Sequence, residues 1–148
     1  MKEQLENKST PLFPISTAAE LLGISVHTLR MYEKEGLIVP FKKDSNQRRY
    51  SRADLERIQC VRRAINEDKI SIEGIKRMLA LIPCWSIMKC SDKEREACPA
   101  YINMEKPCWA YNLEDNVCAK MNCSECEVYN SFVECNSIKD YMKQNWGK

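Results

Sequence analysis

The sequence has no long apolar run and almost no histidine. No stretch approaches the roughly 18 uninterrupted apolar residues of a membrane span, and residues 1–10 are polar and mixed in charge, unlike a secretory signal. We therefore expect a cytosolic protein without a membrane contact. Its 148 residues, 44% apolar and 30% charged, are ordinary for globular protein and predict one or two small domains.

The basic charge is concentrated in the first part of the chain. The net charge is only +2, but 15 basic and 11 acidic residues precede Pro83, whereas 8 and 10 follow it. Residues 25–52 alone hold seven basic and three acidic residues. Because charge clusters are typical of solvated faces as well as of nucleic-acid sites, the local motifs must decide between the two.

Two short helices joined by a glycine-containing turn are predicted near the N-terminus. Thr17 and Glu20 have the spacing of a capping box at the start of the first helix, and Gly23 ends it. Ser25 caps the second helix, which runs to about Glu35. Such a pair is a helix-turn-helix, whose second helix can lie in the major groove of DNA.

A two-stranded wing and two further helices are predicted next. Residues 37–40 are apolar and β-branched, a polar turn follows, and residues 48–50 supply the second strand. Ser51 caps a longer helix, and Ser71 opens another that Pro83 stops. Apolar residues recur at helical spacing along both, so one face of each helix is expected in the core.

Four segments in this order resemble the MerR family of bacterial transcription regulators: residues 28–33, 36–40, 48–51 and 54–55. The resemblance covers about residues 13–82. It implies a winged helix-turn-helix that binds double-stranded DNA at a promoter or operator as a homodimer, with RNA polymerase as a further partner.

The resemblance also implies which side chains meet DNA. Those of the second helix contact the DNA backbone or base edges, and those of the wing hold the flanking phosphates. Phosphate contacts set affinity and salt dependence, whereas base contacts give specificity. His27, the only histidine, is interpreted as facing solvent or DNA rather than a metal. The expected set is His27, Thr28, Arg30 and Tyr32 from the helix, and Lys42, Lys43, Arg48, Arg49 and Tyr50 from the wing.

The sequence departs from the family after Pro83. Family members usually continue into a long helix that pairs with the partner chain, but this chain continues with Cys84 and Trp85. A dimer is thus implied by the resemblance, but no dimer interface can be recognised in the sequence. The best substitute is a tail helix whose apolar stripe pairs two chains or covers the cysteines: Ile138, Tyr141, Met142 and Trp146.

Eight cysteines are clustered in the second part of the chain. A disulfide framework suits small secreted domains rather than a reducing cytosol, and packing explains one or two buried thiols. Metal ligation explains the whole set, since four thiolates complete a tetrahedral zinc site or a [4Fe-4S] cluster. Cys60 stands apart and is interpreted as packing. The expected ligands are Cys84, Cys90, Cys98, Cys108, Cys118, Cys123, Cys126 and Cys135.

The spacing favours an iron-sulfur cluster over zinc. Only Cys123 and Cys126 form a C-x-x-C turn, whereas paired zinc knuckles usually contribute two. Aromatic residues near the cysteines would limit solvent access, and these are Trp85, Tyr101, Trp109 and Tyr129. The doubled Cys-Trp arrangement is similar to cysteine-rich modules appended to bacterial signalling proteins.

The sequence therefore predicts a mainly α protein in three parts. Residues 1–12 are a flexible arm, residues 13–83 a winged helix-turn-helix domain, and residues 84–148 a cysteine-rich module stabilised by a metal or cluster and ending in a helix. The expected function is DNA-binding transcription regulation in which the module senses redox state or metal supply. One alternative is a purely structural zinc module. Another is a thiol oxidoreductase, which lacks a strand-helix context and a nearby histidine. No catalytic role is required.

Overall fold

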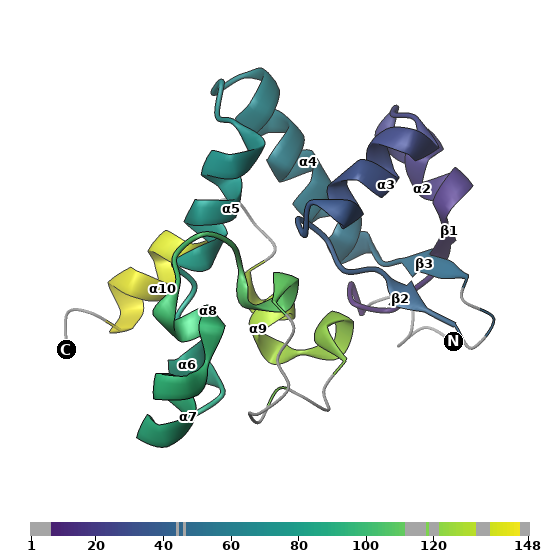
Figure 1. The fold of residues 1–148 in the computed structure, drawn as a ribbon. Helices are drawn as coiled ribbons and strands as arrows, with labels where there is room; N and C mark the ends of the chain where they lie inside the picture. The colour runs from purple at the N-terminus through teal and green to yellow at the C-terminus, as the bar shows by residue number, and fades with distance from the viewer. Residues whose placement is uncertain are drawn as a thin grey trace.

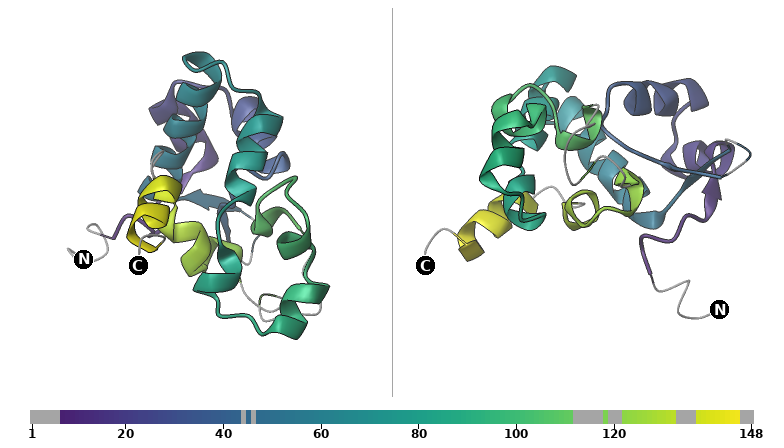
Figure 2. Two further views of the ribbon diagram at one scale, coloured as in Figure 1. Left: turned by 90° about the vertical axis from the view of Figure 1, so that its left-hand side faces the viewer. Right: turned by 60° about the horizontal axis from the view of Figure 1, so that its bottom comes forward.

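The computed structural model describes residues 7–43, 45, 47–111, 118, 122–132 and 137–145, with only the backbone at residues 137 and 138. Helices dominate the regular structure, which confirms the predicted mainly α fold. Figures 1 and 2 show α2, α3 and the three strands at one end and α6 to α8 at the other, with α4, α5 and α9 between them. The elements are β1 (Phe13–Pro14), α2 (Ile15–Leu22), α3 (Val26–Lys34), β2 (Phe41–Lys42), β3 (Arg48–Tyr50), α4 (Arg52–Asn66), α5 (Ile72–Ala80), α6 (Cys84–Ile87), α7 (Asp92–Ala97), α8 (Pro99–Ile102), the 3₁₀ turns η1 (Cys108–Ala110) and η2 (Cys123–Glu125), α9 (Glu127–Ser131) and α10 (Ser137–Asn145).

The predicted helix-turn-helix is formed by α2 and α3. Gly23 ends α2 in the left-handed conformation at φ 67°, which glycine adopts without a Cβ clash. The Ser25 hydroxyl accepts the Thr28 N–H at 3.0 Å and so caps α3. Gly36, at φ 76°, follows the C-cap Glu35. The glycine and serine positions read from the sequence therefore set three of the four helix ends.

The predicted start of the first helix is wrong. Helix α2 begins at Ile15 with Pro14 as its N-cap, and no side chain caps it, so Thr17 and Glu20 do not form a capping box. The reason is that Pro14 lies in β1 and pairs with Arg49 of β3. This pairing, between segments far apart in sequence, starts the helix earlier than the local signal indicated.

The wing is part of a three-stranded antiparallel sheet in the order β1-β3-β2. Its first strand is Phe41–Lys42, in the segment predicted as a polar turn, and not residues 37–40. Leu37 and Ile38 are adjacent and both fully buried in the core. Adjacent side chains of a strand point to opposite faces of the sheet, so a strand with one solvated face would leave one of the two exposed. Leu37 and Ile38 therefore belong to a connection that fills the core.

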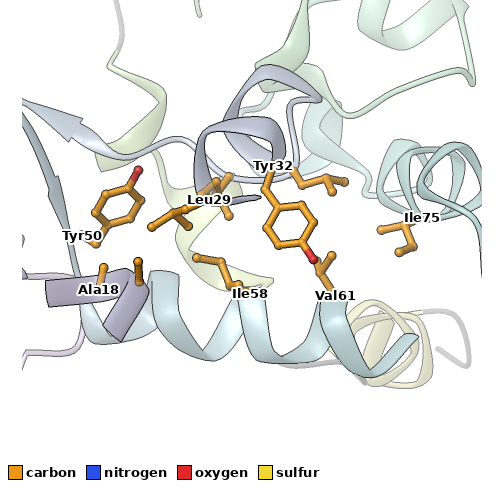
Figure 3. Packing of buried hydrophobic residues seen from close by; sticks show 10 residues of the cluster. Ala18, Leu29, Tyr32, Tyr50, Ile58, Val61 and Ile75 are labelled. Atoms are coloured by element: carbon orange, nitrogen blue, oxygen red, sulfur yellow. The ribbon is translucent and has the colours of Figure 1, made fainter. Parts of the chain in front are cut away.

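Helix α4 is the scaffold of the first half. Ser51 and Asp54 form a complete capping box at its start, as the sequence predicted for Ser51. Figure 3 shows Leu29 and Tyr32 of α3 facing Ile58 and Val61 of α4. Burying a large apolar side chain contributes about 1.5–3 kcal/mol, so these contacts hold α3, the expected recognition helix, against α4.

The segment before the first strand also contacts the helical domain. The Ala53 N–H donates to the Lys8 carbonyl at 2.9 Å, and the Leu12 N–H donates to the Tyr50 carbonyl at 3.1 Å. The Lys8 ammonium lies 3.0 Å from the Glu56 carboxylate. Residues 8–12 thus run along the start of α4 and the edge of β3.

Helix α5 begins at the predicted cap, where the Ser71 hydroxyl accepts the Gly74 N–H at 3.0 Å. It ends at Ala80, before the predicted stop. Ile75 packs in the core that contains Leu29 and Ile58, here called the first core, whereas Ile82 packs in a second core with residues of the cysteine-rich half. Met78 is 48% exposed, so the apolar pattern of this segment is not buried throughout.

The cysteine-rich half consists of short helices around a small second core. Its buried residues include Trp109, Tyr129 and Phe132, together with Cys126. The predicted tail helix is present as α10, and the Tyr141 ring packs 5.7 Å from the Phe132 ring. Tyr141 therefore covers this core. The side chains of Ile138 and Trp146, which share the predicted stripe, lie outside the described residues.

Within the described part of the chain, no helix is both long enough and apolar enough to cross a membrane.

Candidate functional site

A basic groove lies between the recognition helix and the wing. It has a volume of about 420 Å³ and is lined by Arg30 of α3, Arg48 and Arg49 of β3, and Gln47, with Pro14 and Ile15 at its edge. Three arginines from two elements thus line one groove. Because guanidinium donors match phosphate geometry, this groove is the candidate DNA-contacting surface.

One acidic residue ties the wing to the recognition helix. The Arg48 Nε donates to Glu33 Oε2 at 2.5 Å, and Lys42 Nζ lies 3.8 Å from Glu33 Oε1. Glu33 is in α3, whereas its two partners are in β3 and β2. These pairs offset part of the charge of Arg48 and Lys42, so their first effect is to orient the wing relative to α3.

The other predicted surface contacts are accessible. His27 and Arg30 are exposed on α3, and Lys42 and Lys43 are exposed at the wing. Thr28 is half-buried, and its hydroxyl lies 2.9 Å from the Ser25 hydroxyl in the helix cap. Arg49 is half-buried in the groove.

The structure is at odds with the predicted DNA contacts of two tyrosines. Tyr50 is fully buried and Tyr32 is 4% exposed, both in the first core (Figure 3). Burial raises the pKa of Tyr50 above its ordinary value, and the nearby Glu33 carboxylate adds to the shift. Both rings pack against the domain and cannot reach a phosphate without leaving the core. Both tyrosines lie close to basic residues in the sequence, so their packing role was not predicted.

Five of the predicted ligand cysteines line one cavity. They come from four separate segments of the second half, and Trp109, Tyr129, Met88 and Val128 line the rest of its wall. The cavity measures about 20 Å³, which is the room for one water-sized sphere. The five cysteines are Cys84, Cys108, Cys118, Cys123 and Cys126.

The cavity thiols influence one another electrostatically. A hydrogen bond from Cys108 lowers the pKa of Cys84, and the same bond together with burial raises the pKa of Cys108. Burial raises the pKa of Cys118 to about 12 and also raises that of Cys123, with neighbouring Cys126 adding to both shifts. Crowded, buried thiols resist ionisation in the absence of a compensating positive charge.

The remaining predicted ligands are placed differently. Cys90 and Cys98 lie outside the cavity lining, although both are close enough to Cys118 to raise its pKa. Cys135 lies outside the described residues. Cys60 is disulfide-bonded, so the prediction that it only packs is wrong. Among the described side chains, no three histidine, cysteine, aspartate or glutamate groups converge closely enough to hold a metal ion, so ligation of a single ion requires the cavity thiols to draw together.

Two of the four aromatic residues that were expected to shield the cysteines line the cavity. Trp109 and Tyr129 line it and pack edge to face with their ring centroids 5.2 Å apart. Trp85 and Tyr101 make the same kind of contact with each other, also at 5.2 Å. They are not part of the cavity wall. The tryptophans of the two Cys-Trp pairs therefore occupy different environments, although both cysteines line the cavity.

Known proteins match about half of the chain. The family model described as "MerR HTH family regulatory protein" matches residues 13–82. A 74-residue segment is 38% identical to the heat shock protein HspR of Streptomyces coelicolor, covering 50% of this chain and 49% of that protein. A segment of 81 residues is 30% identical to the regulator GlnR of Bacillus anthracis, covering 55% and 60%. The ZntR homolog of Haemophilus influenzae is 41% identical over 68 residues, covering 45% and 50%.

Residues 13–82 belong to the MerR family. These residues are a helix-turn-helix domain of the type by which the family's transcription regulators bind DNA, which confirms the predicted resemblance. GlnR and the ZntR homolog are named as HTH-type transcriptional regulators, in agreement with the expectation that no catalytic role is required. The chain spans about half the length of the curated relatives it matches. The family model covers residues 13–82 and does not extend into the cysteine-rich half.

A buried polar contact between the MerR domain and the cysteine-rich half was not predicted. Asp54 and Arg57 of α4 are 6% and 3% exposed, and both bind the second half. In the sequence, the helix cap already accounts for Asp54, and Arg57 is only one of many arginines near the wing. A single sequence therefore carried no signal for this contact, since the partners Tyr129 and Phe132 are more than 70 residues away.

Proposed function

We propose that this chain is a DNA-binding transcription regulator of MerR type whose cysteine-rich half binds an iron-sulfur cluster or a metal ion and changes promoter binding in response to it. The DNA-binding part of this proposal is supported by the family of residues 13–82 and by the arginine groove. The metal-binding part is carried by one observation, the convergence of five cysteines from separate segments on a single cavity.

The chemistry of the cavity fits a thiolate-bound metal. Five sulfurs are available, and four suffice for either a zinc ion or a cubane cluster. A bound cation would stabilise the thiolate forms, which burial disfavours at Cys118 and Cys123. When bound, the metal would supply redox chemistry if it is iron with sulfide, or a structural cross-link if it is zinc.

Two observations favour different metals. Irregular cysteine spacing and the Trp109 and Tyr129 rings beside the thiols favour a shielded cluster. The small cavity, about 20 Å³, favours a single ion, because a cluster would require the cysteine segments to move apart. A structural zinc module is thus the second candidate.

We further propose that the regulator acts as a homodimer on a palindromic site. One short recognition helix contacts too few bases to select a site from a genome, and a two-fold dimer doubles the contacts. RNA polymerase is the expected further partner at a promoter. A cytosolic location follows from the same proposal.

Metal analysis of the full chain, isolated without oxygen, tests the metal-binding part. We expect iron with inorganic sulfide and visible absorption that bleaches in air. Stoichiometric zinc without visible absorption would support the structural alternative instead. A protein with no metal after anaerobic isolation would overturn both.

Cysteine variants of the full chain test whether the cavity defines the site. We expect Cys108→Ser with Cys123→Ser to lose the metal, because both sulfurs line the cavity. The matched control is Cys90→Ser with Cys98→Ser, outside the lining, which should retain most of it. Equal loss from both pairs would contradict the assignment to this cavity.

A further inference from the structure

Two aromatic residues of the cysteine cavity also bind the MerR domain. Trp109 lines the cavity, and its Nε1 donates to the carbonyl oxygen of Gly36 at 2.6 Å. Gly36 directly follows the C-cap of the recognition helix α3. Trp109 thus connects the cysteine cavity to the C-terminal end of α3, the expected recognition helix.

Tyr129 makes a second connection of the same kind. It also lines the cavity, is 2% exposed, and its hydroxyl donates to Asp54 Oδ1 at 2.8 Å. The same hydroxyl accepts the Val39 N–H at 2.9 Å. One buried oxygen therefore joins the start of α4 to the segment between α3 and β2.

The two connections bracket the link between recognition helix and wing. Gly36 and Val39 stand at either end of the short segment whose middle residues, Leu37 and Ile38, fill the first core. A shift of Trp109 or Tyr129 must therefore displace this segment or break a partly buried hydrogen bond. Leaving such a donor or acceptor unpaired is costly, which favours movement of the segment with the ring.

Arg57 holds both rings from the side of the MerR domain. Its guanidinium donates to the carbonyl oxygens of Tyr129 and Phe132, and its Cζ lies 3.8 Å from the Tyr129 ring centroid and 5.6 Å from that of Trp109. This side chain is 3% exposed. A buried charge is strongly destabilising once it loses its partners. Arg57 therefore resists any movement that would separate it from these carbonyl groups and rings.

We propose that Trp109 and Tyr129 couple the state of the cysteine cavity to DNA binding by the MerR domain, through the segment from Gly36 to Val39. The proposal rests on the proposed function, since a bound metal changes the state of the cavity. Drawing the cavity thiols together on one ion, or spreading them around a cluster, moves the wall that these two rings form. Packed interiors pass such a movement on to their contacts rather than absorbing it.

The coupling between metal binding and DNA binding has an expected size and must be reciprocal. Coupling between two binding sites commonly changes affinity by about 5-fold to 150-fold. The metal-loaded and metal-stripped protein should therefore differ in affinity for the same DNA by at least about 5-fold. By linkage, bound DNA changes the metal affinity by the same factor.

Conservative substitutions in the full chain test the proposal, and the doubled Cys-Trp pattern supplies matched controls. Tyr129→Phe removes the hydroxyl that binds Asp54 and Val39, and Trp109→Phe removes the donor to Gly36. The controls are Tyr101→Phe and Trp85→Phe, whose rings pack against each other away from the cavity wall.

For each protein, DNA affinity is measured in the state isolated without oxygen and after removal of metal by a chelator. The probe is a duplex selected from a random library by the wild-type chain. We expect the ratio of the two affinities to fall to within about 2-fold of unity in Tyr129→Phe and Trp109→Phe, below the usual range of coupling. Both controls should keep the wild-type ratio.

Metal content and DNA affinity separate the outcomes. If the wild type holds no metal, the proposed function fails and the coupling fails with it. If metal is present but the affinity ratio is unity in the wild type, or is unchanged in both Tyr129→Phe and Trp109→Phe, the coupling alone is overturned. A loss of DNA affinity that is equal in both metal states would show a merely structural role for these residues. Retained metal in the variants verifies that their cysteine-rich half is folded.

Discussion

The docking of the cysteine-rich half on the MerR domain can be tested at two glycines that end neighbouring helices. Gly23 and Gly36 both have left-handed backbones, at φ 67° and φ 76°. A Cβ on Gly23 meets nothing within 4 Å, whereas a Cβ on Gly36 lies 2.8 Å from the Ala110 Cβ. Ala110 belongs to η1 of the cysteine-rich half, and its Cβ cannot rotate away.

The two substitutions to alanine should therefore differ by the cost of that overlap. An L-residue in the left-handed region costs about 1–2 kcal/mol, and this cost applies to both. Overpacking adds about 1–3 kcal/mol, and it applies to Gly36→Ala alone. With a urea m value of about 1–3 kcal/mol per M, the added cost lowers the unfolding midpoint by roughly 1 M.

Urea unfolding of the full chain, followed by far-UV circular dichroism, measures the difference. The double variant Gly36→Ala with Ala110→Gly should recover most of the added loss, because it removes the atom that is struck. If Gly36→Ala and Gly23→Ala destabilise the protein equally, or if Ala110→Gly restores nothing, the two halves do not pack at this turn in solution.

Two further predictions concern the DNA surface and a salt bridge. Arg49→Ala should weaken binding to a selected duplex and lower the slope of log affinity against log salt concentration by about one unit. Tyr50→Phe should change neither quantity, because the Tyr50 hydroxyl is buried and has no hydrogen-bond partner among the described residues. A lower slope for Tyr50→Phe would show that this tyrosine contacts a phosphate after all. The Lys76 ammonium, 2.8 Å from Glu35, lowers the pKa of Glu35 below its ordinary value near 4.5. Its contribution, under about 1 kcal/mol for such a partly exposed pair, is present above that pH and lost as the pH falls through the lowered pKa. Thermal unfolding of Lys76→Met should thus approach that of the wild type in acid, and a constant difference at all pH values would contradict this.

Local signals in the sequence determined most helix ends of the MerR domain. Gly23, Ser25 and Ser51 act within a few residues of themselves, through a left-handed backbone or a hydroxyl that satisfies a nearby amide. Such interactions depend little on the rest of the molecule, so the order of motifs was enough to predict the family and the mainly α fold. The start of α2 was missed because it depends on a strand pairing with Arg49.

Only the tertiary structure decided which residues line the arginine groove, the cysteine cavity or the core. Tyr50 and Arg49 are adjacent and equally suited to a phosphate by residue type, but the strand directs Tyr50 into the core and Arg49 into the groove. Trp85 and Trp109 each follow a cysteine, yet only Trp109 lines the cavity and binds the MerR domain. Composition and spacing determine which groups are available, whereas the contacts between segments distant in sequence determine where each group points.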